Sequence, residues 1–183
     1  SHIEQPDLVV LGIGAEPVAY LAMTAGLNCD DGVIVDPYMR TSDPRILAIG
    51  DVAKFPSAFA GYIRLESVQN ANDQARIAAA TIAGELTPYT AIPWFWSVQG
   101  KERLQISGLL PPSSERHIRA GAHPNSFSVL HYVGETLACV ESINAPADHM
   151  AARKLQAQGI SPPADLACDP ESPLSSVLSN AAT

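Results

Sequence analysis

The sequence predicts an α+β protein, in which a partial α/β segment is followed by a small C-terminal unit with an antiparallel sheet and helices. Three observations predict this class. Residues 7–13 form a continuous apolar run typical of a buried parallel strand. Residues 67–83 have helical periodicity. Apolar and polar residues alternate mainly after residue 94, as expected of antiparallel strands. Because the first part has too few strand–helix units to cover a parallel sheet, we expect it to be the remainder of a larger domain.

The first half predicts short elements that end in glycine. The run DLVVLGI predicts a strand over 7–13, closed by Gly12 and Gly14. EPVAYLAMTAGL predicts a helix over 16–27 that ends at Gly26. GVIVDPYMRTSDPRILAIGD then predicts a short strand, an Asp-Pro turn and a second strand, Ile46–Ile49, which runs into Gly-Asp.

A longer helix is predicted from Ser67 to Ala83. Gly84 is expected to cap its C-terminus. Its apolar positions recur every three or four residues and form a stripe of Val68, Ala71, Ala75, Ala78, Ala79 and Ile82.

The composition changes near Thr87, where TPYTAIPWFWSV holds two prolines and both tryptophans. Strands are predicted over Leu104–Leu109, Phe127–Val133 and Leu137–Ile143. HMAARKLQAQG then predicts a short amphipathic helix that ends at Gly159. The remainder, rich in proline and serine, is expected to be extended with frayed ends.

Composition argues against several classes of protein. A net charge of −8 disfavours a nucleic-acid binder, which needs a basic face. No apolar run approaches the ~20 residues of a membrane span. The three cysteines lie far apart, so we expect no disulfide framework, no metal site and the reduced thiols of a cytoplasmic protein. The histidines have no metal-ligand spacing, and His131 is expected to be a partly buried sheet residue.

Asp51 and the start of the helix that follows it suggest a bound cofactor. A carboxylate at the end of a strand can accept hydrogen bonds from a polyol such as the ribityl chain of a flavin. The helix start near Ser67 offers free N–H groups and the positive end of a dipole, which would stabilise a reduced flavin by about 1 kcal/mol. Taken alone, Asp51 is equally well explained as a turn or cap residue. Val68 and Gln69 could likewise be the first turn of a surface helix.

Three segments in close succession are more specific together: RTSDPRILAIGDVAKF, RLESVQNANDQARIAA and IPWFWSVQ. Their combination resembles the flavoprotein ferredoxin reductases of bacterial oxygenase systems, the putidaredoxin, rhodocoxin and biphenyl dioxygenase reductase family. PDLVVLGIGAEPVAYLAMTAGL and SVLHYVGETLACVESINAPADHMAARKL also resemble that family. The resemblance therefore extends to about Asp169.

The resemblance implies an enzyme in which NADH reduces FAD, and FAD passes single electrons to an iron–sulfur ferredoxin. It implies that Asp51 accepts hydrogen bonds from the ribityl or diphosphate region. Val68 would contact the pyrimidine edge through its backbone N–H, flanked by Ser67 and Gln69. Trp96 would lie near the isoalloxazine, on the side where electrons leave.

Further positions follow from the same resemblance. Gly12 and Gly14 resemble the loop under the nicotinamide. Arg64 and Arg76 are candidates for meeting an acidic ferredoxin. Trp94 and Trp96 share one strand face by their spacing, so at least one of them could serve packing alone.

The resemblance also divides the chain. Residues 1–30 would end an NADH-binding domain, 31–90 would be the second part of an FAD-binding domain, 91–160 a C-terminal reductase domain, and 161–183 a Pro/Ser-rich tail. Two departures stand out. Val98 occupies a position where the family usually has Asp. No Gly-x-Gly-x-x-Gly is present to cradle the FAD pyrophosphate or NADH. We therefore expect a missing N-terminal FAD- and NADH-binding region, weak FAD binding or none, and no turnover by this chain alone.

Two alternatives stay open. The first is another FAD-dependent NADH oxidoreductase, although the absence of a cysteine pair disfavours a disulfide reductase. The second is a non-catalytic dimerisation or interaction module formed by 94–159. A homodimer is expected if apolar surface is exposed. A copurifying flavin would favour the enzyme, and a colourless, well-folded dimer would favour the module.

Overall fold

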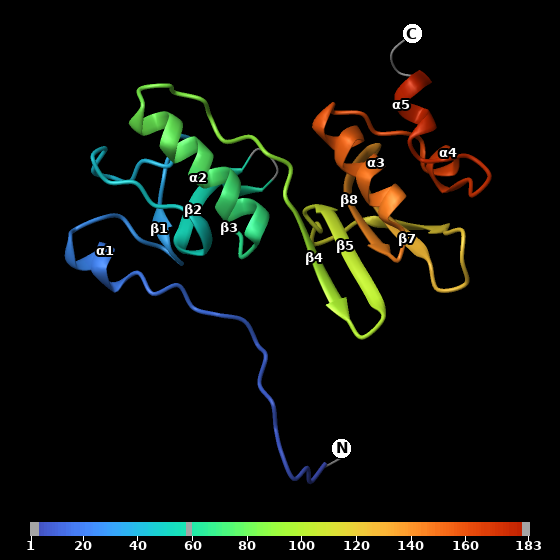
Figure 1. The fold of residues 1–183 in the computed structure, drawn as a ribbon, viewed down its shortest axis with the longest axis horizontal. Coiled ribbons are helices and arrows are strands. Elements are labelled where there is room, and N and C mark those ends of the chain that lie inside the picture. The colour runs from blue at the N-terminus through green and yellow to red at the C-terminus, as the bar shows by residue number, and fades with distance from the viewer. Residues whose placement is uncertain (1–3, 58–59, 181–183) are drawn as a thin grey trace.

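The computed structural model describes residues 4–57 and 60–180 and contains two units, each built on its own sheet (Figure 1). The first unit has a three-stranded sheet in the order β1-β2-β3, next to helix α2 (Val68–Ile82). The second has a five-stranded antiparallel sheet in the order β4-β5-β8-β7-β6, with helix α3 (Pro146–Ala157) on one face. The predicted α+β class is confirmed.

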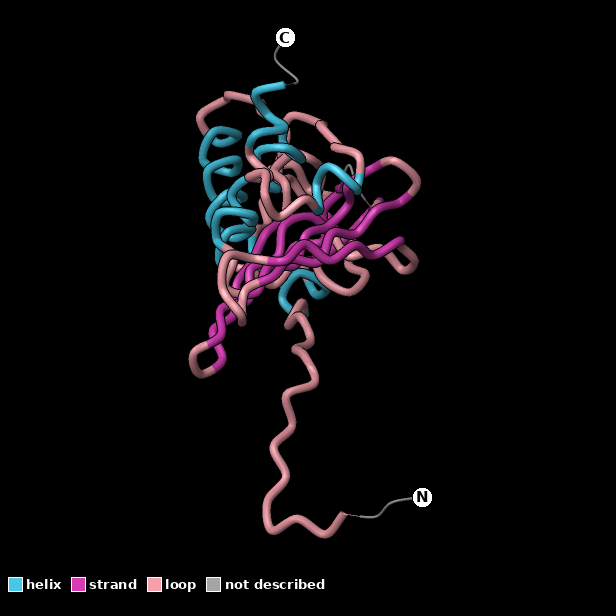
Figure 2. Tube along the Cα trace, turned by 90° about the vertical axis from the view of Figure 1, so that its right-hand side faces the viewer, coloured by secondary structure: helices cyan, strands magenta, loops and turns pink. Residues whose placement is uncertain are grey.

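The N-terminal segment departs from the prediction. Residues 4–19 are extended and form no strand, and they run away from the rest of the chain (Figures 1 and 2). Val10 and Ile13 are 84% and 88% exposed. A strand needs a neighbour to satisfy its backbone groups, and no described segment pairs with this one. Helix α1 (Tyr20–Thr24) keeps only the central turn of the predicted helix, because it has no surface to pack on.

The strand predicted over Ile46–Ile49 is also absent. This stretch contributes only an isolated bridge between Arg40 and Leu47. The chain then turns through the 3₁₀ helix η1 (Gly50–Val52) and enters β2 (Ala53–Ser57). β2 pairs in parallel with β1 (Val33–Ile34) and antiparallel with β3 (Gly61–Arg64). Asp51 therefore lies before a strand, not after one.

Helix α2 confirms the predicted helix almost to the residue. The Ser67 hydroxyl caps its start by accepting a hydrogen bond from the Asn70 N–H at 3.1 Å. At its end, Gly84 has a φ of +87° and donates to the Thr81 carbonyl, while Glu85 donates to Ala80. This pair of bonds is a Schellman motif, and its left-handed residue explains why glycine follows the helix.

The buried residues of α2 coincide with its apolar stripe only at Ala78. Val68 and Ile82 are 61% and 76% exposed. The buried residues are three amides and one alanine: Gln69, Asn70, Gln74 and Ala78. The periodicity predicted the position of the helix correctly, but the most apolar edge of α2 faces solvent in this chain.

The second unit confirms the predicted strands and adds others. β5 (Glu102–Gly108), β7 (Phe127–Val133) and β8 (Thr136–Ile143) match the three predicted strands to within two residues at each end. β4 (Trp94–Gln99) and β6 (Glu115–Ala120) form the two edges. Helix α3 begins three residues before the predicted helix and packs on β8 and β5.

The C-terminal segment is not the extended tail that its composition predicted. It forms helices α4 (Ala164–Cys168) and α5 (Ser176–Asn180), and it buries Ala167, Leu174 and Val177 in the core of the second unit. Residues 181–183 lie outside the described part of the chain. Burial of these apolar side chains therefore docks the segment on the second unit.

The described part of the chain contains no disulfide. All three cysteines are free. Among the described residues, no group of His, Cys, Asp and Glu could hold a metal ion, and no helix is long and apolar enough to cross a membrane. His131 is more deeply buried than expected, between Ser114 and Glu141, to which its ring nitrogens are hydrogen bonded.

Candidate functional site

The candidate flavin-contacting groups come from the turn η1 and the start of α2, which pack against each other. Asp51 is exposed in the middle of η1. Its backbone carbonyl accepts a hydrogen bond from Arg64 at 3.1 Å, which leaves its carboxylate free of any described ion pair. The residue before it, Gly50, is buried with a φ of +74°, a conformation that glycine adopts without steric cost.

The first turn of α2 presents backbone donors. The Ser67 hydroxyl uses the N–H of Asn70, so the N–H groups of Val68 and Gln69 have no acceptor within the helix. Val68 itself is exposed. A helix of this length carries a positive partial charge at this end, so the turn can stabilise an anionic group placed against it.

A buried amide network holds these two parts together. Gln74 accepts a hydrogen bond from the Gly50 N–H at 2.7 Å and donates to the Asn70 side-chain oxygen at 3.1 Å. Asn70 also accepts from the Tyr89 hydroxyl at 3.0 Å and donates to the Leu65 carbonyl. Burial raises the pKa of Tyr89 to about 12, so this hydroxyl stays protonated and remains a donor.

Gln69 connects the same helix start to the second unit. Its side-chain oxygen accepts a hydrogen bond from the Trp94 backbone N–H at 3.3 Å, and its amide nitrogen donates to Asp73. Gln69 was predicted to flank the flavin. Its side chain is nearly fully buried in this joint, so only its backbone N–H is available to a ligand.

Trp94 and Trp96 stack on one face of β4, as their spacing predicted. Their ring centroids lie 5.5 Å apart with an interplanar angle of 29°. The Arg153 guanidinium lies 4.2 Å from the Trp94 ring centroid, and the His149 ring packs at 5.7 Å. Trp94 is thus partly buried, whereas Trp96 is 41% exposed and is the indole more available for contact with another molecule.

A groove of about 280 Å³ lies beside the helix start, lined by the β3–α2 link, the start of β4, the end of β5 with the loop after it, and Glu141 of β8. Glu66, Ser67 and Glu141 contribute its polar side chains, and Trp94, Phe95 and Leu109 are among its apolar ones. Such a largely apolar lining with a few polar groups can hold part of a flat aromatic ring system.

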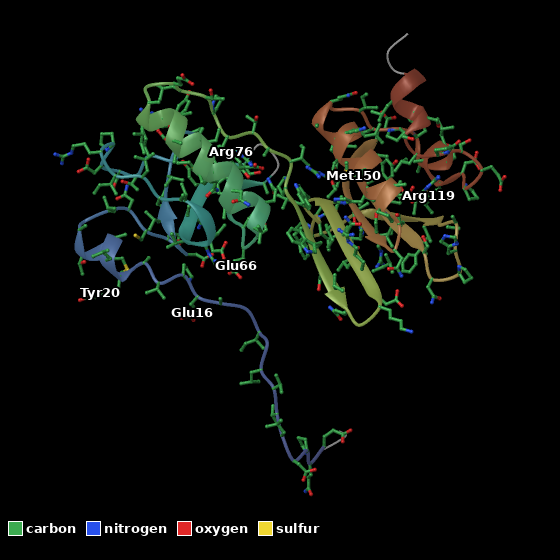
Figure 3. The ribbon with its side chains drawn as sticks, viewed as in Figure 1. Glu16, Tyr20, Glu66, Arg76, Arg119 and Met150 are labelled. Atoms are coloured by element: carbon green, nitrogen blue, oxygen red, sulfur yellow. The ribbon has the colours of Figure 1, made fainter. Side chains whose placement is uncertain are left out.

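The two predicted docking arginines differ in availability. Arg64 is largely buried and pairs with Glu66 at 2.7 Å and Asp31 at 3.4 Å. The hydrogen bond to Glu66 raises the pKa of its guanidinium. Arg76 projects from α2, is 75% exposed, and among the described residues pairs with Asp73, one turn earlier in the helix (Figure 3). Arg76 can reorient toward a partner, whereas Arg64 is used within the chain.

Gly12 and Gly14 are not brought to this site. Both lie in the extended N-terminal segment, and a Cβ added to either would meet no atom within 4 Å. The segment touches the site region only through the Ala15 carbonyl, which accepts a long hydrogen bond of 3.4 Å from Arg64. Their predicted contact with nicotinamide therefore stays a prediction.

Sequence reasoning missed the residues that organise the site: Asn70, Gln74 and Tyr89. A signal for them exists. Asn70 and Gln74 are four residues apart, and polar amides repeated at that spacing among alanines lie on one helix face. The apolar stripe lies on a neighbouring side of the helix and shares only Ala78 with the buried face.

Comparison with known proteins covers nearly the whole chain. Residues 3–75 match the pyridine nucleotide-disulphide oxidoreductase family, and residues 94–178 match the family described as reductase C-terminal. Rhodocoxin reductase of Rhodococcus erythropolis is 48% identical over 82% of this chain and 36% of its own length. Putidaredoxin reductase of Pseudomonas putida is 35% identical over 96% of this chain and 42% of its own length. The chain thus spans about two fifths of the length of these curated relatives.

Solved structures agree. The ferredoxin reductase for the CYP199A2 system from Rhodopseudomonas palustris has a TM-score of 0.88 at 44% identity, covering 93% of this chain and 43% of that one. The reductase in the covalent putidaredoxin reductase–putidaredoxin complex has a TM-score of 0.89 at 34% identity, covering 97% and 43%. In sequence and in fold, therefore, the chain belongs to the flavoprotein ferredoxin reductases, and it corresponds to their C-terminal part.

Proposed function

We propose that this chain forms the ribityl and isoalloxazine side of an FAD site in an NADH-dependent ferredoxin reductase, and that it needs an N-terminal FAD- and NADH-binding region for turnover. The observation that carries the proposal is the chain of hydrogen bonds that joins the Asp51 turn to the α2 start, and the α2 start to the strand that carries the Trp94–Trp96 stack. The length of the relatives supports the need for a second part. Residues 1–30, 31–90, 91–160 and 161–183 keep the domain roles predicted from the sequence.

Each site residue has a distinct task in this proposal. Asp51 accepts hydrogen bonds from the hydroxyls of the ribityl chain. The backbone N–H groups of Val68 and Gln69 face the pyrimidine edge, with Ser67 fixing the turn that presents them. Trp96 covers the isoalloxazine on the side from which electrons leave. FAD, when bound, takes a hydride from NADH and releases electrons one at a time.

The proposed electron acceptor is an iron–sulfur ferredoxin. A related reductase has been solved in a covalent complex with putidaredoxin, which supports a partner of this kind. Arg76 is the exposed cation on the side of α2. We propose that Arg76 forms an ion pair with an acidic group of the ferredoxin, and that the less exposed Arg64 adds positive charge to the same region. The free cysteines fit a reducing, cytoplasmic location.

The proposal is tested by the visible absorption spectrum of the purified chain, recorded before and after incubation with excess FAD and desalting. A retained flavin band that Asp51→Ala removes and Asp165→Ala keeps supports the assigned site. Asp165 is an exposed carboxylate of the second unit and serves as the matched control. A band that survives Asp51→Ala would overturn the role given to Asp51.

The enzyme assignment needs a second test, because the chain alone is expected to be colourless or weakly coloured. The chain is mixed with a separately produced FAD- and NADH-binding part of rhodocoxin reductase. Ferredoxin reduction by the mixture, lowered by Arg76→Glu and not by Arg116→Glu, supports the proposal. A colourless dimer that never complements would instead favour the interaction module, and NADH oxidation without ferredoxin reduction would favour another FAD-dependent oxidoreductase.

A further inference from the structure

Gln74 lies at the contact between the Asp51 turn and helix α2, and its side chain has no solvent exposure. Its side-chain oxygen accepts a hydrogen bond from the Gly50 N–H at 2.7 Å. Its side-chain nitrogen donates a hydrogen bond to the Asn70 side-chain oxygen at 3.1 Å. The two ends of one amide thus join the turn that carries Asp51 to the helix turn that begins at Ser67.

The arrangement leaves the turn few other anchors. Gly50 has a left-handed φ, and a Cβ on it would contact Ala71 of α2 at 3.6 Å, so turn and helix approach closely here. The remaining described polar contact of the Asp51 backbone is the Arg64 bond to its carbonyl at 3.1 Å. The Gly50 N–H is the backbone donor next to Asp51. A buried donor without a partner lowers the stability of the folded state, so the bond from Gly50 to Gln74 determines the position of the turn relative to α2.

Asn70, the acceptor of the Gln74 side chain, is itself fixed by hydrogen bonds. Its side-chain oxygen accepts hydrogen bonds from Gln74 and from the Tyr89 hydroxyl, and its side-chain nitrogen donates one to the Leu65 carbonyl. Each side-chain nitrogen and oxygen in this chain of bonds therefore has a partner. A buried network of this kind is rigid, and it restrains the distance between its two ends.

We propose that Gln74 is a positioning residue for the flavin site: it holds the Asp51 carboxylate in register with the N-terminus of α2, so that one cofactor can contact both. The proposal rests on the proposed function in so far as the cofactor is a flavin. The coupling of the turn to the helix is a property of the chain itself and can be measured without any cofactor.

The first measurement is amide hydrogen exchange at Gly50 in the full chain, with Gln74→Met as the test and Asn72→Met as the control. Methionine keeps the volume of glutamine but offers no hydrogen bond of comparable strength, and Asn72 lies exposed on the same helix. We expect Gly50 to exchange about tenfold faster in Gln74→Met and at the wild-type rate in Asn72→Met, since one hydrogen bond is lost. An unprotected Gly50 amide in the wild type would overturn the proposal even if Gln74→Met failed to fold.

The second measurement is a double-mutant cycle on FAD affinity, followed by quenching of flavin fluorescence. Because Gln74 acts through Asp51, Gln74→Met should weaken FAD binding severalfold in the wild type and have no further effect in Asp51→Ala. If Gln74→Met and Asp51→Ala lower FAD affinity independently, so that their effects add in the double variant, Gln74 has a merely structural role and the proposal is overturned. If the wild type alone binds no FAD, the same cycle is measured on its mixture with the FAD- and NADH-binding part of rhodocoxin reductase. A mixture in which these variants leave FAD affinity unchanged would reject the flavin assignment, while the exchange experiment still decides whether Gln74 couples turn and helix.

Discussion

At the scale of single residues, the second unit contains a buried histidine with no hydrogen-bonding partner. Neither ring nitrogen of His149 is paired within the described chain. Burial, with smaller contributions from Arg153 and Arg103, lowers its pKa to about 4. The ring is therefore neutral in the folded protein near pH 7 and packs on Trp94 as an apolar surface.

This histidine makes stability depend on pH. Its pKa rises from about 4 to its ordinary 6.5 on unfolding, so between these values the unfolded chain binds more protons. Stability should fall as pH drops from 6.5 toward 4, by up to about 3 kcal/mol from this residue. Urea unfolding at pH 7 and pH 4.5 should show a smaller loss in His149→Phe than in the wild type. The exposed His123→Phe serves as the control, and equal losses in all three proteins would contradict the assignment.

Arg119 is the buried cation of the same unit, and it organises the C-terminal segment. Its guanidinium donates to Asp148 at 3.2 Å and to the carbonyls of Ala167 at 2.9 Å, Asp169 at 2.5 Å and Ser172 at 2.7 Å. Figure 3 shows Arg119 beside the elements that contain these groups. One side chain thus donates hydrogen bonds to three backbone carbonyls of this segment.

Arg119→Met should therefore cost about 3–5 kcal/mol, because it leaves Asp148 buried without its cation. Urea unfolding measures this loss. Limited proteolysis should show faster cleavage between residues 161 and 178. Arg116→Met removes an exposed charge from the same strand and should change neither result. Unchanged cleavage in Arg119→Met would mean that apolar burial alone holds the segment.

At the scale of elements, helix α2 depends on its N-cap. Ser67→Ala removes the acceptor for the Asn70 N–H and should lower the free energy of unfolding by about 1 kcal/mol. Ser67→Asp should restore it, since aspartate caps equally well. Thermal unfolding followed by circular dichroism at 222 nm checks both variants. Ser113→Ala, in an exposed loop, is the control, and equal stability of Ser67→Ala and wild type would argue against the cap.

The elements that could be predicted from the sequence are those whose pattern is local. α2, β7 and β8 have clear periodicity and are found where it indicated. β6 escaped because its pattern is reversed: Ile118 faces solvent, and the buried residue is Arg119. The strand predicted over 7–13 has no described neighbour, and a strand forms only by pairing. In the site, Ser67 and Val68 could be located from the helix start, whereas Gln74 becomes recognisable only once Gly50 is placed against it.

At the scale of the whole molecule, the extended N-terminal segment presents an unusual amount of apolar surface. Leu8, Leu11 and their apolar neighbours are all exposed. An extended, exposed apolar segment can pair with another chain. We therefore keep the prediction that this chain self-associates.

Sedimentation velocity over a range of concentrations tests that prediction. The wild type should show a weight-average sedimentation coefficient that rises with concentration, and Leu11→Glu should reduce this rise because a buried carboxylate opposes pairing. Gln5→Glu adds the same charge to the segment without removing an apolar side chain. A wild type that sediments as a monomer at every concentration would reject self-association.

The position of the two tryptophans determines what the intrinsic fluorescence of the protein reports. Both indoles of the chain lie at the joint between the two units, one covered by Arg153 and His149 and the other stacked on it. Intrinsic tryptophan emission therefore reports on the joint and on almost nothing else. If the red shift of this emission precedes the loss of helical ellipticity during unfolding, the units part before either melts. If the two signals coincide, the joint is as strong as the cores that it connects.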